Sequence, residues 1–198
     1  ATLIKNAKRP LIIAGAGVLK SGAMDELKEL AEKAQIPVTN TLVGLGGFPG
    51  NHELALGMVG MHGSVAANNS TEEADLVIAA GIRFHDRITG HPDFFCKKAK
   101  IIHIDIDPAE IDKNVTINVP IVGDLKRVLS ELNTLVEPTT HETWIAQIRE
   151  WQAEYPMVIP ESKDGVLHPQ YVLSELNKIA KEDAVIVTDV GQHQMWAA

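Results

Sequence analysis

Continuous apolar runs alternate with amphipathic segments along the chain. Each run is short and ends in glycine or a polar residue, which is typical of a buried strand. The five clearest runs span residues 9–17, 36–42, 75–81, 99–107 and 118–123. Between them, segments such as 21–35 and 124–137 repeat their apolar positions with helical spacing. This alternation predicts an α/β fold, a doubly wound, Rossmann-like parallel sheet of about six strands with helices on both faces.

Several helices are predicted with more detail. The segment 64–74 reads as a helix, and Pro108 opens a short helix, where its missing N–H costs nothing. Asp124 is the expected N-cap of the helix over 124–137. The residues expected to face inward from that helix are Leu125, Val128, Leu129, Leu132 and Leu135.

Residues 43–63 are rich in glycine and lack a strong period, so we predict a long functional loop. Further along, 142–156 and 168–183 read as helices, and 184–191 as one more buried strand. We therefore divide the chain into a domain over 1–140, a connector with a helix over 141–166, and the incomplete start of another domain over 167–198. The chain begins with Ala1 rather than Met and stops inside an apparent helix, so we expect a fragment of a longer protein.

The composition narrows the class of protein. The 26 acidic against 18 basic residues give a net charge of −8, which argues against nucleic acid or an anionic membrane as the partner. No apolar run is long enough to span a membrane, and no signal peptide is legible, so a cytoplasmic protein is expected. Cys96 is the single cysteine and is predicted to be an inert packing residue.

Ligands of doubly wound sheets bind at the carboxyl ends of the strands. The residues that fall there are Gly15, Ala16, Gly17, Thr41, Leu42, Gly81, Arg83, Asp105 and Gly123. Arg83 and Arg87 can neutralise a diphosphate through their planar forks of donors, with Asp86 orienting one of them. The alternative is a surface ion-pair cluster. Asp105 can accept hydrogen bonds from a ribose.

Other ligand chemistries fit less well. The "GAG" at 15–17 is not a dinucleotide fingerprint, because Lys20 stands where a third glycine is needed and no acid follows the second strand. His62 lies between glycines, where it either packs against a flat ring or faces water. The histidines lack the spacing of a zinc site, so no metal is assigned to this chain. Gly191, Gln192 and His193 open a helix after a strand, where free N–H groups bind anions.

Several motifs occur in one order: "GAG", "TLVGLGGFP", "GMHG", "GIRFHDRITG", "IIHIDIDPAEIDKN", "VGD" and "VGQHQMWAA". Together they resemble the catalytic subunits of the acetolactate synthase (acetohydroxyacid synthase) family of thiamine-diphosphate enzymes. The resemblance implies a central FAD-binding domain with six parallel strands, one more than we count in the first domain. The FAD contacts that it implies are Gly15, Ala16, Gly17, Thr41, Leu42, Met61, His62, Gly63, Gly81, Arg83, Asp86, Arg87, Ile88, Asp105, Ile106, Gly123 and Asp124. Those implied for thiamine diphosphate are Gly191, Gln192 and His193.

The family decarboxylates pyruvate on thiamine diphosphate and transfers the two-carbon unit to pyruvate or 2-ketobutyrate, a step of branched-chain amino acid biosynthesis. The resemblance implies that the activating glutamate precedes this chain and that the Mg²⁺ motif lies beyond residue 198. No catalytic residue is therefore expected here, and the chain alone should be inactive. A homodimer or tetramer, and a small regulatory subunit, are the implied partners.

One position departs from the family pattern. The family usually reads "RFDDR", whereas this chain reads "RFHDR", so His85 removes a negative charge beside Arg83 and Arg87. Glyoxylate carboligase and pyruvate oxidase share the central fold and FAD, and oxalyl-CoA decarboxylase binds ADP there instead. A stand-alone nucleotide-binding module is the alternative from another class.

Overall fold

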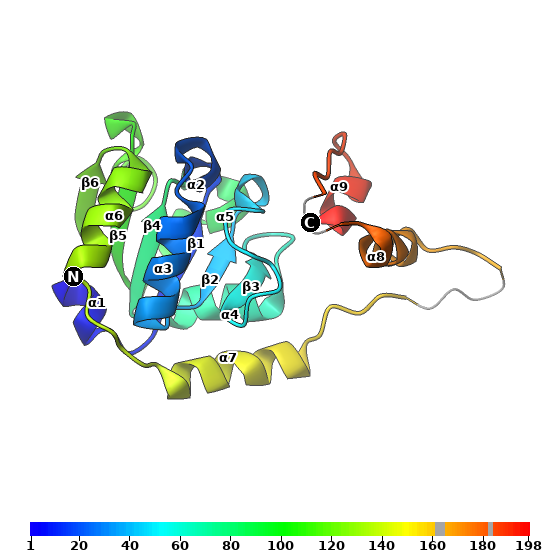
Figure 1. Cartoon of the computed structure of the whole chain (residues 1–198), viewed down its shortest axis with the longest axis horizontal. Coiled ribbons are helices and arrows are strands. Elements are labelled where there is room, and N and C mark those ends of the chain that lie inside the picture. Colours follow the sequence, from blue (N-terminus) through cyan, green and yellow to red (C-terminus); the bar gives the residue numbers. More distant parts are fainter. Residues whose placement is uncertain (161–164, 182–183) are drawn as a thin grey trace. The chain divides into compact units, whose positions relative to one another are not determined.

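The computed structural model describes residues 1–160, 165–181 and 184–198. The chain forms two compact units, Ala1–Tyr155 and Pro156–Ala198, which are described separately below (Figure 1).

The first unit is built on six parallel strands. They are β1 (Pro10–Ala14), β2 (Val38–Asn40), β3 (Ala55–Met58), β4 (Leu76–Ala80), β5 (Lys100–Asp105) and β6 (Val119–Val122). Their order is β3-β2-β1-β4-β5-β6, so the chain builds outward from β1 and then returns to pair β4 with β1 on its other side. This confirms the predicted doubly wound sheet. All strands are parallel, and the direction in which the chain adds them to the sheet reverses between β1 and β4.

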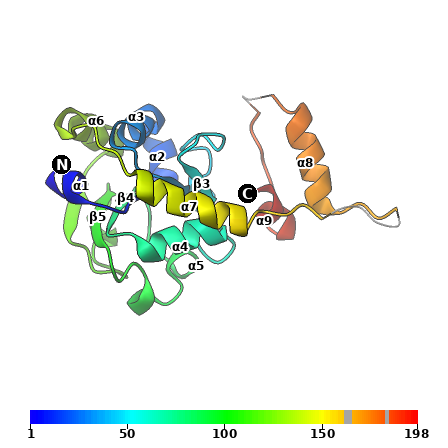
Figure 2. The same cartoon turned by 90° about the horizontal axis from the view of Figure 1, so that it is seen from below.

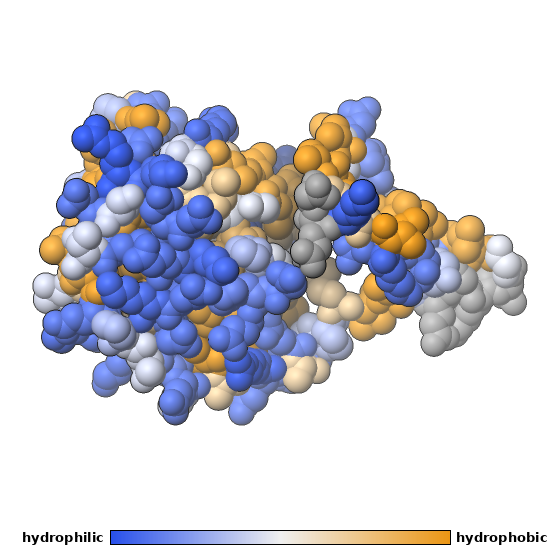
Figure 3. Space-filling model, viewed as in Figure 1, coloured by the Kyte–Doolittle hydropathy of each residue, from blue (hydrophilic) through white to orange (hydrophobic). Residues whose placement is uncertain are grey.

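Helices cover both faces of the sheet, as Figure 2 shows from below. One face carries α1 (Thr2–Asn6), α2 (Ala16–Ser21), α3 (Met24–Ala34) and α6 (Leu125–Leu135), and the other carries α4 (Val65–Glu73), α5 (Asp86–Thr89) and α7 (Glu142–Glu154). Side chains of β1 alternate between the two cores, because Ile12 packs on one face and Leu11 and Ile13 on the other. The outer surface over α3 and α6 is mostly hydrophilic, as expected of amphipathic helices (Figure 3).

Three predictions in this unit were wrong in detail. Residues 43–63 are not only a loop, because they contain β3, which is short, interrupted by Gly57 and buried at alternate positions. Pro108 opens only a 3-10 turn, η3 (Pro108–Glu110). Leu135 is 65% exposed at the last position of α6, and Asn133 is buried instead, donating from Nδ2 to the Glu26 carbonyl. The N-cap prediction is confirmed, since Asp124 accepts from the Arg127 amide at 3.0 Å.

The second unit contains α8 (Pro169–Ile179) and α9 (Gln192–Ala197). The strand predicted over 184–191 is not formed, and Val185, Ile186, Val187 and Val190 are exposed. A strand is stabilised only by pairing with another strand, and the described part of this unit contains none. The predicted helix over 168–183 ends at Ile179, and residues 182–183 lie outside the described ranges.

Candidate functional site

The loops after β1 and β4 cross each other in direct backbone contact. Gly15 N–H donates to the Ala80 carbonyl at 2.9 Å, and Gly17 N–H donates to the Gly81 carbonyl at 3.0 Å. A Cβ on Gly17 would lie 2.5 Å from the Gly81 Cα, and Gly81 has a φ of +62°. These glycines are therefore needed first for the close approach of two chain segments at the switch point of the sheet.

The carboxyl end of β2 leaves buried polar groups without partners. Thr41 N–H donates to the Ala14 carbonyl, and the following 3-10 turn η1 (Leu42–Gly44) brings Gly44 so close that a Cβ would lie 2.3 Å from that same carbonyl. Asn40 Oδ1 and Thr41 Oγ1 are buried and find no hydrogen-bond partner among the described residues. Buried polar atoms are normally paired, so these two are available to a bound group.

The loop of residues 60–63, which follows β3, is fixed to the loop after β4. Met61 N–H donates to the Arg87 carbonyl at 3.0 Å, and a Cβ on Gly60 would lie 2.3 Å from that carbonyl oxygen. Asn68 of α4 holds Gly60 with two hydrogen bonds, one to its N–H and one to its carbonyl. The side chains of Met61 and His62 are exposed on this loop. A hollow of about 400 Å³ adjoins it.

Arg83 and Arg87 both lie exposed on the loop after β4. Arg87 Nε is 3.9 Å from Asp86 Oδ2, a weak surface pair, and the Arg83 guanidinium makes no ion pair with any described residue. The arrangement is therefore not a closed surface ion-pair cluster, and both guanidinium groups remain available. Ile88, in contrast, turns its side chain into the core.

The ends of β1, β5 and β6 enclose a cavity of about 140 Å³. Its lining includes Gly17, Lys20, Ser21, Gly81, Asp105, Ile106, Gly123 and Asp124. The Asp105 carboxylate accepts from the Asp107 amide at 2.9 Å, and its other oxygen lies 3.8 Å from His103 Nε2. The carboxylate of Asp124 is already used as the α6 cap, so its side chain is occupied by the fold.

His103 is a fully buried neighbour of this cavity. Its Nε2 lies 2.9 Å from the Ile82 carbonyl, so that nitrogen donates, and Nδ1 has no partner within the described ranges. The imidazole packs edge-on against Phe84, with ring centroids 4.9 Å apart.

The structure thus gathers the seventeen predicted FAD residues along one edge of the sheet, with at least two at or just after the end of each strand. The sequence interpretation missed Asn40, Asn68, Ser21 and the place of Lys20 in the lining of the cavity. Asn40 was legible as a polar residue ending a buried strand. Asn68 lies inside a predicted helix, and only the fold shows that it faces the loop of residues 60–63.

Gly191, Gln192 and His193 lie in the second unit, at the exposed start of α9. Among the described residues there is no cluster of three or more His, Cys, Asp or Glu suited to a metal ion. None of the helices in the described ranges is long and apolar enough to cross a membrane.

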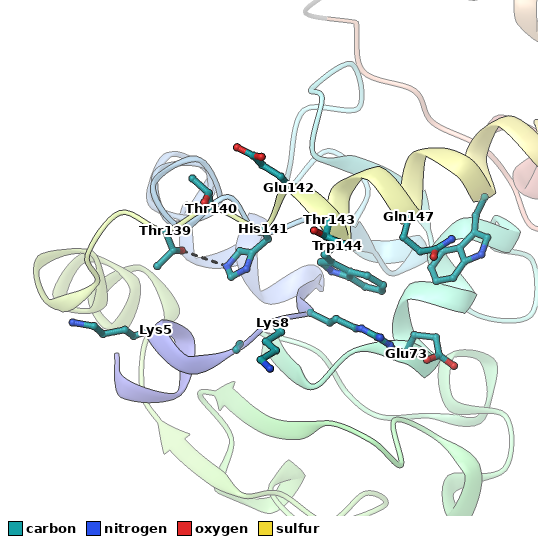
Figure 4. Close-up of a pocket in the computed structure, with 13 residues that line it drawn as sticks. Lys5, Lys8, Glu73, Thr139, Thr140, His141, Glu142, Thr143, Trp144 and Gln147 are labelled. Atoms are coloured by element: carbon teal, nitrogen blue, oxygen red, sulfur yellow. Dashed lines mark hydrogen bonds and ion pairs between the residues drawn. The ribbon is translucent and has the colours of Figure 1, made fainter.

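A larger hollow, of about 1060 Å³, lies at the opposite, amino-terminal ends of the strands (Figure 4). Two of its cations pair with acids, since Lys5 lies 2.6 Å from Glu137 and Arg9 lies 3.1 Å from Glu73. Burial lowers the pKa of His141, whose Nε2 lies 3.3 Å from Thr139 Oγ1. No predicted site residue lies there.

Comparison with known proteins identifies the family. Residues 1–132 match the family described as "Thiamine pyrophosphate enzyme, central domain". The chain is 48% identical to "Acetolactate synthase" of Mycobacterium bovis, over 100% of this chain and 33% of that protein. It is 49% identical to "Probable acetolactate synthase large subunit" of Methanocaldococcus jannaschii, over 100% of this chain and 35% of that protein. The match to "Acetolactate synthase large subunit" of Corynebacterium glutamicum is 46%, over 99% and 32%.

The chain therefore spans about a third of the length of the curated relatives it matches. The family match covers most of the first unit, including all six strands and the loops at their carboxyl ends. The chain belongs to the thiamine pyrophosphate enzymes, and residues 1–132 are a central domain of that family.

Proposed function

We propose that this chain is the FAD-binding central portion of an acetolactate synthase. The observation that carries the proposal is the junction of the β1 and β4 loops. Two exposed guanidinium groups, two buried polar atoms without partners among the described residues, and a cavity beside a carboxylate all lie along the same edge of the sheet. These are the groups that a diphosphate joined to polyhydroxylated chains and a nucleoside requires.

The residues fit the parts of FAD. Arg83 and Arg87 would neutralise the diphosphate, because guanidinium donors match phosphate oxygens. Asp105 would accept hydrogen bonds from the adenosine ribose in the cavity beside Gly123. Asn40 and Thr41 would give their unpartnered side-chain oxygens to hydroxyl groups. The loop with Met61 and His62 would lie against the flavin.

In the complete enzyme, bound thiamine diphosphate with Mg²⁺ supplies the chemistry that decarboxylates pyruvate and passes the two-carbon unit to pyruvate or 2-ketobutyrate, and the flavin does no net redox work. The start of α9, with Gly191, Gln192 and His193, would meet the diphosphate of that cofactor through its amide groups. A homodimer or tetramer with a small regulatory subunit, working in the cytoplasm, completes the proposal.

The experiment is a titration of the purified chain with FAD, followed by flavin fluorescence. Arg87→Ala should weaken binding about tenfold, the loss expected for a hydrogen bond to a charged group. Arg149→Ala is the matched control, because Arg149 is an exposed arginine of α7 whose one ion pair among the described residues is with Glu53. ADP and NAD are titrated in parallel. In the complete enzyme, Arg87→Ala should also raise the FAD concentration needed for half-maximal acetolactate formation.

Saturable FAD binding that weakens in Arg87→Ala and not in Arg149→Ala supports the proposal. NAD binding without FAD binding overturns it, as does equal affinity of both variants for FAD. Binding of ADP with no contribution from the flavin half would instead favour a nucleotide-binding module.

A further inference from the structure

The short helix α5 begins with an unusual cap. The backbone N–H of Arg87 donates to His85 Nδ1 at 3.2 Å and to Asp86 Oδ1 at 3.0 Å. The His85 carbonyl then accepts from the amides of Ile88 and Thr89. A helix of four residues gains little from its own backbone bonds, so it depends on its caps.

The cap requires a neutral imidazole at His85. Since Nδ1 accepts the Arg87 amide proton, the ring must carry its own proton on Nε2. Protonation places a second proton on Nδ1, so two donors then face each other across 3.2 Å. The new Nδ1–H is also attracted to Asp86 Oδ1, 3.8 Å away, which is the second acceptor of the same amide. One protonation therefore weakens both hydrogen bonds to the Arg87 amide.

The hydrogen bonds to the Arg87 amide fix the position of Arg87. The loop of residues 60–63 in turn depends on the position of Arg87. The Arg87 carbonyl accepts the Met61 amide at 3.0 Å and lies against Gly60. A shift of the first turn of α5 therefore displaces both the Arg87 guanidinium and the loop of residues 60–63. The loop after β4 and the loop of residues 60–63 are therefore linked through the Arg87 carbonyl.

We propose that His85 is a positioning residue for Arg87, and that it makes the affinity of the site for a flavin dinucleotide depend on pH. The inference rests on the function proposed above. Neutral His85 holds the binding geometry, and protonated His85 releases it. Affinity is therefore full while the His85 ring is neutral, and it falls as the ring takes up its second proton on Nδ1.

Charged groups near His85 come from its own loop, from the loop of residues 60–63, and from the segment with Asp112 and Lys113, whose neighbour Asn114 donates to the Phe84 carbonyl. Asp86 and Arg87 lie on α5, Arg83 lies just before it, and His62 lies on the facing loop. The His85 side chain is 43% exposed, so its charged form is accessible to solvent. The arginines repel an imidazolium and Asp86 attracts it. Because all these groups are exposed, solvent screens their effects on one another.

Two measurements test the proposal. Nuclear magnetic resonance first follows the His85 ring and the Arg87 backbone amide of the chain from about pH 8 to about pH 5.5, the range in which histidine titrates. The Arg87 amide should shift with the same midpoint as the His85 ring. The second measurement is the FAD titration over the same range. Affinity should fall about fivefold towards the acid end, the factor that matches a lost cap.

Variants separate positioning from a general structural effect. In His85→Asn and His85→Asp the side chain still caps α5 but does not titrate in this range, so both should keep the affinity seen at high pH and lose the pH dependence. His85→Leu should bind FAD about fivefold more weakly at every pH, because it cannot cap. His62 is unchanged in His85→Asn, so this variant separates the effect of His85 from any effect of His62.

Some results overturn the inference. They are an Arg87 amide that does not respond when the His85 ring does, an FAD affinity that is unchanged or higher at acid pH, and a His85→Asn variant that retains the full pH dependence. If the chain binds no FAD at any pH, the proposed function fails, whereas the amide titration still decides whether His85 holds Arg87.

Discussion

The glycines at the switch point show how closely single residues control the site. Gly17 and Gly81 touch through backbone atoms, so neither position has room for a side chain. In the structure, the motif "GAG" makes a close backbone approach to the loop after β4. A ligand site at this edge therefore depends first on two chain segments meeting without side chains between them.

Gly81→Ala should lower the free energy of unfolding by about 3 kcal/mol, because it combines a left-handed backbone with a clash against Gly17. Gly22→Ala is the matched control. Gly22 has a φ of +64°, close to that of Gly81, but a Cβ there meets no described atom within 4 Å. The control should cost only about 1 kcal/mol. Urea unfolding measures both values, and equal losses would show that the contact contributes nothing.

At the scale of helices and strands, the sequence predicted what strong periodicity specifies. The buried strands β1 and β4 are uninterrupted apolar runs and β5 is mostly apolar, so their positions followed directly. The strand β3 was missed because four residues containing Gly57 give no legible period. The apolar run 184–191 reads like β4, yet it forms no strand, because pairing partners are not encoded in the run itself.

The residues of the candidate site likewise fall into those that the sequence pattern predicted and those that it did not. Residues that end strongly apolar strands, such as Asp105, were found by position alone. The burial of Asn40 Oδ1 and the hydrogen bond from the Gly60 amide to Asn68 were missed, because burial and side-chain orientation arise only when distant segments pack. The His85 cap was also invisible, since it depends on which ring nitrogen faces the Arg87 amide.

Glu73 joins three elements at the amino-terminal edge of the sheet. It ends α4, pairs with Arg9 before β1 and with Lys98 before β5, and these cations hold the pKa of its carboxyl below the ordinary value, mainly through the hydrogen bond from Lys98. A lowered pKa stabilises the fold above the pKa of the unfolded chain, and this stabilisation is lost as the pH falls towards the folded-state pKa.

Glu73→Gln should therefore reduce the free energy of unfolding at neutral pH by up to about 1 kcal/mol, since solvent screens this partly exposed group. The difference from the unsubstituted protein should shrink once the pH falls below about 4. Urea unfolding at the two pH values measures it. Glu72→Gln is the control, because Glu72 is exposed and makes no ion pair with a described residue. A loss for Glu73→Gln that persists at acid pH would contradict the prediction.

For the molecule as a whole, the compact first unit extends beyond the family match. The match ends at residue 132, whereas the first unit runs to Tyr155. The segment predicted as a connector supplies α7, which buries Trp144 and Ile148 against the unit. The indole N–H of Trp144 donates to the Pro10 carbonyl at 3.0 Å, so α7 is bound to the start of β1.

A chain of residues 1–155 should therefore fold, whereas a chain of residues 1–140 should melt about 10 °C lower or more. The shorter chain loses two buried apolar side chains and leaves the Pro10 carbonyl without its donor. Thermal unfolding followed by circular dichroism compares the two. Identical melting temperatures would show that α7 adds no stability.

The pairing of β1 with β4 has a consequence for the order of events in folding. Pro10 lies opposite Leu76, so the centre of the sheet joins segments far apart along the chain, while β2 pairs with its neighbours over shorter loops. Pairing between distant segments forms slowly, because the intervening loop must close before any contact rewards it. The crossing of the β1 and β4 loops belongs to this late step. If the proposed function holds, flavin added during refolding should therefore bind only after the sheet centre has closed, and it should not speed the earlier steps.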